Sequence, residues 1–254
     1  MSRSKFALSM ILALPAFAAD PALVVDRGLP QQNLNNVSGT ARSNVRWGWL
    51  DHGFLGDDFS IGVPGEHWVI DSIRTWTVPG RSGATLPTLG DFYQDVRLHV
   101  GKDNVTPVST AQLTAGSNET SNADVRVTEA SAEGALPYDD FGTPLRVWQV
   151  QFDNLSLSVE GGATYRFGVW GIGRPVPGME GKNFTWYNHA SNAALSGSRQ
   201  EGADGKMLLF DAAGRAEGEF NAEGNGWDKN ADINIQIFAH RVDSKQAPKR
   251  QVRQ

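Results

Sequence analysis

Cysteine is absent from this chain, and no segment after the first 18 residues has a sustained helical period. The lack of cysteine excludes disulfides, a thiol nucleophile and cysteine-ligated zinc. The chain also lacks a Gly-x-Ser-x-Gly elbow, a His-Glu-x-x-His pair and a phosphate-binding glycine loop. None of the common catalytic signatures is present, which favours a protein without enzymatic activity.

Positive charge is also scarce, with 23 Lys and Arg against 28 Asp and Glu and a formal net charge of -5. Nucleic-acid binding needs a basic face to replace counterions, so a nucleic acid is not an expected partner. The one basic cluster is the C-terminal tail, residues 242–254, which we expect to be solvated and disordered. No segment is apolar for the roughly 20 residues of a membrane-spanning helix, so no membrane anchor is expected.

The N-terminus has the three parts of a secretory signal peptide. Arg3 and Lys5 precede a short apolar run, residues 6–14, and the small-residue pattern Ala16-x-Ala18 follows. The sequence therefore predicts a signal peptide over residues 1–18 and a secreted or periplasmic protein. An N-terminal helix buried in the fold is the alternative. Because the exported chain lacks disulfides, its stability must come from its core or from bound ions.

Apolar residues alternate with polar ones in several segments, the pattern of strands with one buried face. Turn-forming Gly, Pro, Asn and Asp separate these segments. The pattern predicts an all-β fold, an antiparallel β-sandwich with jelly-roll topology, in a single domain over residues 19–241. The clearest expected strands are Val96–Val100, Trp148–Phe152, Tyr165–Val169 and Ile233–Ile237; shorter ones are Ala22–Val25, Val45–Trp49, Asp58–Ile61, Val125–Thr128, Phe184–Tyr187 and Met207–Phe210.

Two of the expected strands carry a more specific prediction, one about a bulge and one about the exposure of a histidine. Over His67–Val78 the apolar spacing shifts near Asp71, which predicts a strand with a bulge, with a helix as the alternative. His99 alternates with apolar neighbours, which predicts a solvated surface histidine. Gly28–Asn44, Gly80–Asp95 and Leu195–Gly205 are expected to be long irregular stretches.

Several short sequence motifs resemble those of a known group of domains. The motifs are Leu55–Ser60 with Trp68–Ile73, Leu155–Leu157 with Gly161–Tyr165, and Ala231–Phe238. They are similar to the opening, a hairpin and the last strand of jelly-roll domains in uncharacterised bacterial secreted and surface proteins, some with PEP-CTERM-type sorting tails. The resemblance implies an extracellular, non-enzymatic module, although this chain shows no sorting signal after Arg241.

Acidic residues near the C-terminus suggest a cation site. Asp228, Asn230 and Asp232 place oxygen side chains at every second position, as in the first part of a calcium-binding loop. Ile233 stands where an EF-hand needs glycine, so an EF-hand is excluded. A structural calcium ion is the prediction, and a polar turn is the alternative. Asp57 and Asp58, an adjacent pair, are expected in a solvated loop or a similar calcium site.

Eight tryptophans provide the second candidate chemistry, because indole rings stack on sugar rings while nearby polar groups bond the hydroxyls. Trp68, Trp76 and Trp148 fall in apolar strands and are expected in the core. The expected ligand-binding residues for a glycan or cell-surface component are Trp47, Trp49, Trp170, Trp186, Tyr187 and Trp227.

Two other functions remain open from the sequence. Jelly-roll enzymes cleave polysaccharides with a pair of carboxylates, for which the candidates are Glu129, Asp139, Asp153 and Glu160. A matrix or assembly protein would instead pair exposed strand edges between neighbouring molecules.

Overall fold

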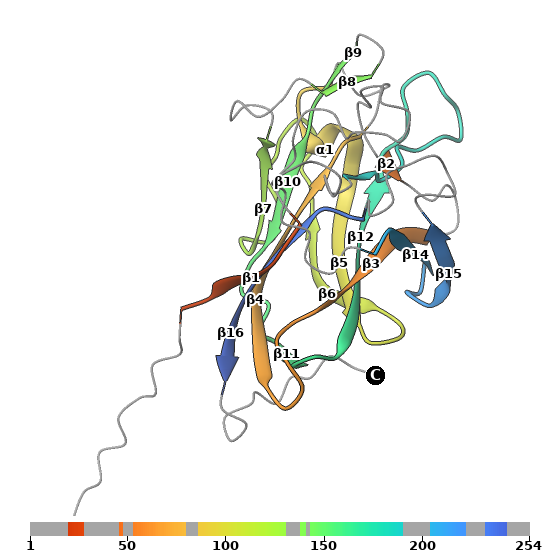
Figure 1. Cartoon of the computed structure of the whole chain (residues 1–254). Coiled ribbons are helices and arrows are strands. Elements are labelled where there is room, and N and C mark those ends of the chain that lie inside the picture. The colour runs from red at the N-terminus through yellow and green to blue at the C-terminus, as the bar shows by residue number, and fades with distance from the viewer. Residues whose placement is uncertain are drawn as a thin grey trace, which may run out of the picture.

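The structure of the protein is a computed structural model, and it describes residues 20–27, 46–47, 53–79, 86–130, 138–140, 143–189, 204–221 and 232–242. Figure 1 shows that the described chain is built almost entirely of strands. The one helix in these segments is the short α1 (Leu89–Phe92).

The strands form two antiparallel sheets. In spatial order, the first sheet contains β1 (Ala22–Asp26), β16 (Ile235–Val242), β4 (His67–Thr77), β10 (Trp148–Phe152) and β7 (Val125–Glu129), and β11 (Leu157–Glu160), β13 (Asn188–His189) and β2 (Arg46–Trp47) attach to it. The second contains β15 (Ala216–Asn221), β14 (Lys206–Asp211), β3 (Gly53–Ser60), β12 (Thr164–Gly173), β5 (Tyr93–Gly101) and β6 (Thr106–Gln112). A small separate hairpin joins β8 (Tyr138–Asp140) to β9 (Thr143–Leu145).

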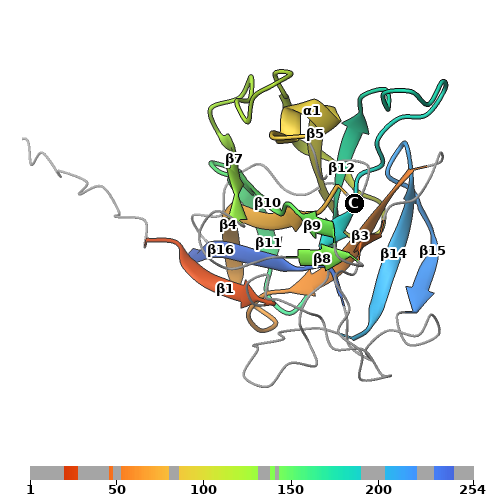
Figure 2. The ribbon, with the colours of Figure 1, turned by 90° about the horizontal axis from the view of Figure 1, so that it is seen from above.

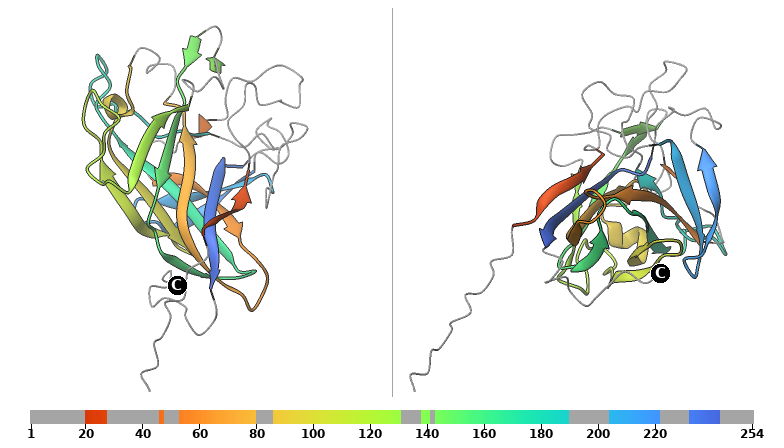
Figure 3. Two further views of the ribbon diagram at one scale, coloured as in Figure 1. Left: turned by 90° about the vertical axis from the view of Figure 1, so that its left-hand side faces the viewer. Right: turned by 60° about the horizontal axis from the view of Figure 1, so that its bottom comes forward.

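The two sheets pack against each other as a sandwich, which is visible from above in Figure 2 and from two more sides in Figure 3. Ile73 and Ile237 of the first sheet and Leu98 and Phe167 of the second are fully buried in one shared core. Each of these side chains lies on the apolar face of an alternating strand, so alternation in the sequence determines which face meets the other sheet. The predicted all-β sandwich is confirmed, and the jelly-roll topology stays a prediction.

The predicted bulge in β4 is present. Phe238 of β16 lies opposite Ser72, but the next residue, Ala239, lies opposite Ile70. Asp71 is therefore the extra residue, and its backbone carbonyl accepts a hydrogen bond from the Leu155 amide at 3.0 Å. The bulge keeps Ile70 and Ile73 both in the core even though their spacing breaks the period of two.

The predicted core tryptophans divide into two groups. Trp76 and Trp148 are 1% and 0% exposed, as predicted. Trp68 is half-buried, packs at the margin of the core and donates its indole N–H to Glu66 at 3.1 Å.

Two sequence expectations about local structure are wrong. Phe184–Tyr187 is not a strand; pairing begins only at Asn188, because the preceding residues leave the sheet plane to lie over β12. In the expected irregular stretch Gly80–Asp95, the described residues 86–95 contain α1 and the start of β5. Thr88 and Asp91 cap α1, with the Thr88 amide donating to the Asp91 carboxylate at 3.1 Å.

Candidate functional site

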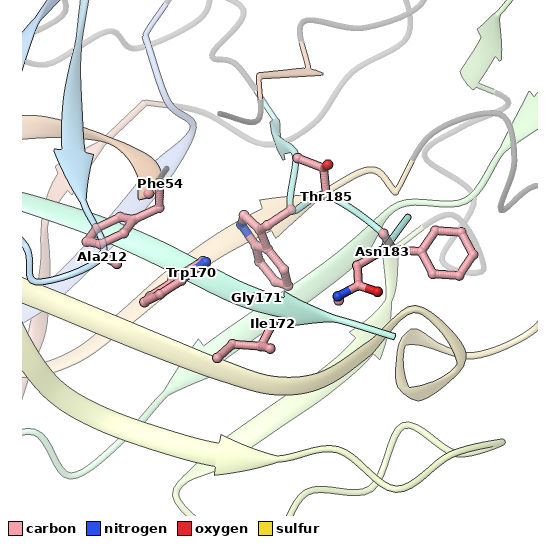
Figure 4. Close-up of a pocket in the computed structure, with 11 residues that line it drawn as sticks. Phe54, Trp170, Gly171, Ile172, Asn183, Thr185 and Ala212 are labelled. Carbon is pink, nitrogen blue, oxygen red and sulfur yellow. The ribbon is translucent and has the colours of Figure 1, made fainter. Parts of the chain in front are cut away.

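A pocket opens in the second sheet where β3 and β12 separate (Figure 4). The two strands pair as far as Gly56 opposite Gly168. Beyond that point β3 stays beside β14, up to Gly53 opposite Asp211, while β12 stays beside β5 as far as Gly173. The resulting gap is a cavity of about 240 Å³.

Two of the predicted ligand-binding residues, Trp170 and Trp186, line this pocket together. The other lining residues are Gly53, Phe54, Gly171, Ile172, Gly173, Asn183, Phe184, Thr185 and Ala212. They come from β3, from the end of β12, from the segment before β13 and from the turn between β14 and β15. The sequence identified the two tryptophans as candidates, and the divergence of two strands brings them to one place.

Trp186 forms an inner wall of the pocket. Its indole lies over Gly171, where an added Cβ would be 2.1 Å from the ring carbon Cε3. Its ring centroid is 4.8 Å from that of Tyr93, and its N–H donates to the Asn188 side chain at 3.1 Å. Because Trp186 is only 4% exposed, it offers an edge to a ligand rather than an open stacking face.

Trp170 is the more accessible aromatic wall, on the outer face of β12. The Phe54 ring stacks near it, with the ring centroids 5.6 Å apart and the planes 17° from parallel. The Arg97 guanidinium lies 5.6 Å from the indole centroid, on the neighbouring strand β5. These two contacts fix the orientation of a half-buried indole, which gives the pocket a preorganised apolar surface.

His99 packs against Phe54, which lines the pocket, and the prediction of a solvated histidine is wrong. The side chain is 2% exposed, with its ring centroid 4.5 Å from that of Phe54. It does point away from the main core, but the outer face carries a second small apolar cluster with Phe54, Leu208 and Phe210. Burial lowers the pKa of His99 to about 4, so the ring is neutral at pH 7.

Asn183 and Thr185 bring polar side chains to the pocket, and sequence reasoning did not single them out. Asn183 is exposed and Thr185 half-buried. Both follow a tight hairpin in which the Phe184 amide donates to the Arg174 carbonyl at 2.9 Å. Their position beside Trp186 in the sequence was the available signal, because residues that flank an aromatic in an irregular segment can share its pocket.

Tyr187, also a predicted ligand residue, lies next to the pocket without lining it. It is half-buried, and its carbonyl accepts hydrogen bonds from the Thr77 hydroxyl at 2.6 Å and the Val78 amide at 3.2 Å. Trp47 is in β2 opposite Asn188, and only its backbone is described. Trp49, Trp227, Asp228 and Asn230 lie outside the described residues.

Asp232, the predicted calcium ligand that the structure does describe, lies in a buried ionic cluster. Its carboxylate is 4.0 Å from the Arg27 guanidinium and accepts the Asp204 amide at 2.7 Å. Arg27 also donates to Asp57 at 2.8 Å, and all three side chains are at most 1% exposed. Asp57 is thus in β3 inside the sandwich, and the expectation of a solvated loop at Asp57 and Asp58 is wrong.

The cluster holds two carboxylates against one guanidinium in a buried site. Burial raises the pKa of Asp232 to about 6 and that of Asp57 well above its ordinary value. Arg27 and the backbone amides of Ile233 and Asp58 act in the opposite direction on Asp57. Within the described segments, no group of three acidic or histidine side chains is arranged to hold a metal ion, and calcium stays a prediction.

Three of the four carboxylates considered for hydrolysis are paired with basic residues. Glu129 contacts Arg146 at 3.0 Å, Asp153 contacts Arg126 at 2.8 Å, and Glu160 contacts Lys102 at 3.0 Å. None of these three lines the pocket. Asp139 belongs to β8, where only the backbone is described.

Fold and site together define the protein as an all-β sandwich with an aromatic pocket in its second sheet. No protein-family model, no curated protein and no solved structure matches the chain. Across the described segments, no helix is long and apolar enough to cross a membrane.

Proposed function

We propose that this chain is an exported, non-enzymatic recognition module that binds carbohydrate in the pocket between β3 and β12. The observation that supports it is the meeting of Trp170, Trp186 and Asn183 around one cavity. A sugar ring has an apolar C–H face and a rim of hydroxyls. The indole of Trp170 suits the first, and the Asn183 amide and Thr185 hydroxyl suit the second.

The rigidity of the pocket supports the same role. Phe54 and Arg97 hold Trp170, while Gly171 and Asn188 hold Trp186. A preformed site avoids the entropy cost of ordering side chains on binding, which matters for a ligand as polar and weakly bound as a sugar.

Binding is tested by calorimetric titration of residues 19–254 with glucose, galactose, mannose and N-acetylglucosamine. We expect at least one of these sugars to bind, and Trp170→Ala to weaken that binding by about tenfold, equivalent to about 1.4 kcal/mol. Trp68→Ala is the matched control, since Trp68 is also half-buried but lies on β4, outside the pocket. The proposal fails if no carbohydrate binds, or if both variants bind as the unmodified protein does.

Export rests on the signal-peptide pattern of residues 1–18. The expected result is cleavage after Ala18 when the full chain is expressed in a secreting bacterium, as shown by N-terminal sequencing of the processed protein. An uncleaved cytoplasmic product would contradict this part of the proposal.

Structural calcium is the remaining element of the proposal. A cation bound only by the folded protein raises its stability, by about 2.7 kcal/mol at a concentration one hundred times the dissociation constant. We therefore expect calcium to raise the melting temperature and Asp228→Asn to reduce that increase. Equal melting temperatures in calcium and in a chelator would refute it.

A further inference from the structure

None of the described residues that line the pocket has an ionisable side chain. All of them are glycine, aromatic, aliphatic or neutral polar residues. A buried or half-buried charge on a ligand would lose its hydration without gaining a counter-ion from these residues. The lining therefore disfavours uronic acids, sialic acids and sulfated sugars.

Arg97 and Asp211 are charged side chains next to residues that line the pocket, and each is held by a partner near it in sequence. Arg97 stacks against Trp170, and its guanidinium donates to Asp95 at 2.7 Å. Asp211 precedes the lining residue Ala212, and its carboxylate accepts hydrogen bonds from the Ala213 and Arg215 amides at 2.9 and 2.8 Å. These hydrogen bonds, with one from the Arg215 guanidinium, lower the pKa of Asp211, so it is ionised but compensated.

The shape of the pocket limits the ligand to one ring. A cavity of about 240 Å³ is below the range of roughly 300–1,000 Å³ that is usual for drug-sized ligands. Three chain segments surround the strip of β12 between Trp170 and Gly173: the start of β3, residues 183–186, and the turn at Ala212. A polysaccharide passing through would need an open groove at both ends, whereas a chain end can enter from one side.

From this lining and shape, and resting on the proposed function, we infer that the pocket binds a single neutral pyranose at the end of a glycan chain. Asn183 is the specificity-determining residue, because among the described lining residues it is the one with a side-chain amide. An amide both donates and accepts hydrogen bonds, so it can distinguish the orientation of a sugar hydroxyl.

The test compares the affinities of residues 19–254 for defined sugars. Glucose, galactose and mannose are titrated beside glucuronic and galacturonic acid, and the neutral sugar that binds is then used as a free ring, as oligosaccharides of increasing length, and with its non-reducing end blocked. We expect the neutral sugar to bind at least about tenfold more tightly than its uronic acid. Lengthening the chain should change the affinity less than about threefold, and blocking the end should abolish binding.

Asn183→Ala should reduce the preference between glucose and galactose. Met179→Ala is the matched control, since Met179 is 56% exposed on the same hairpin but does not line the pocket. A higher affinity for the uronic acid, a steady gain with chain length, or an unchanged preference in Asn183→Ala would overturn the inference while leaving carbohydrate binding intact. The absence of binding to any sugar would refute both.

Discussion

Arg27 and Asp57 form a fully buried ion pair between the end of β1 and the middle of β3, with 2.8 Å between the guanidinium and the carboxylate. The same guanidinium donates to the carbonyl oxygens of Ile233 and Asp58. One arginine therefore connects the first strand, a central strand of the second sheet and the residues that lead into the last strand.

Replacing Arg27 with methionine should be strongly destabilising, because it leaves Asp57 and Asp232 buried without their guanidinium partner. Removing one member of a buried pair typically costs about 3–5 kcal/mol. Urea denaturation measures the loss. Arg126→Met is the control, since the Arg126 pair with Asp153 is largely exposed and contributes at most about 1 kcal/mol. A change below about 1 kcal/mol in Arg27→Met would show that the cluster relaxes or takes up water.

Two buried groups should give opposite pH dependences of stability in one window. His99 has a folded pKa of about 4 against 6.5 when unfolded, so its contribution is present above pH 6.5 and lost as the pH falls toward 4. Full loss corresponds to about 3 kcal/mol. Asp232 has a folded pKa of about 6 against 3.8, so its contribution is present below pH 3.8 and lost as the pH rises through 6.

Single substitutions should separate these two contributions. His99→Phe removes the histidine titration and keeps an aromatic ring beside Phe54, so its stability should decrease as the pH rises from 4 to 6. Asp232→Asn removes one of the two carboxylates whose pKa is raised, so its stability should increase with pH relative to that of the unmodified protein over the same range. Urea midpoints at several pH values measure both slopes, and equal slopes in the two variants would contradict the assignment.

The sequence predicts most of the sandwich because its central strands carry alternation. β5, β10 and β12 were expected close to their observed positions, whereas β16 begins two residues after the start of the expected strand Ile233–Ile237 and continues to Val242. β6 and β15, the two edge strands of the second sheet, were not, because they carry few buried apolar residues: Thr106–Gln112 is mostly exposed or half-buried, as are the residues of β15 whose exposure is described.

The site was less predictable, for a different physical reason. Alternation gives the face of a strand but not what covers that face. It placed His99 on the outer side of β5, yet it could not reveal the second cluster of Phe54 and Phe210 that buries it. Likewise Arg27, Asp57 and Asp232 are far apart in sequence, and only the pairing of β1 with β16 and the packing of the sheets bring them together.

Gly171 should be essential for the geometry of the pocket. A Cβ there would overlap the Trp186 indole, with 2.1 Å to the nearest ring atom, so Gly171→Ala must displace that ring or β12. We expect a lower melting temperature and a changed tryptophan fluorescence spectrum. Gly218→Ala is the control in β15, where the nearest atom would be Leu209 Cδ1 at an ordinary 3.8 Å. If the two variants behaved alike, Trp186 would not be held as described.

A row of polar side chains crosses the outer face of the first sheet and should act as a unit. Asp26, Gln236, Arg74, Gln151 and Arg126 occupy one register row over five neighbouring strands. Arg74 donates to Gln236 at 3.0 Å and to Gln151 at 3.1 Å, and Gln236 donates to Asp26 at 3.1 Å. At the far end, Gln151 and Arg126 both donate to Asp153, at 2.8 Å.

Because Arg74 contacts both glutamines, Gln151→Ala and Gln236→Ala should not be additive. Each removes an acceptor from the same guanidinium, and residues in one hydrogen-bond network couple by about 0.5–3 kcal/mol. A double-mutant cycle followed by urea denaturation measures this coupling. Gln149→Ala combined with Gln236→Ala is the matched cycle, since Gln149 lies on the same face of β10 but outside the row, and its coupling should be below about 0.5 kcal/mol. Equal coupling in both cycles would mean that the row consists of independent surface contacts, and that β1 is held to the sheet by its pairing with β16 and by Arg27.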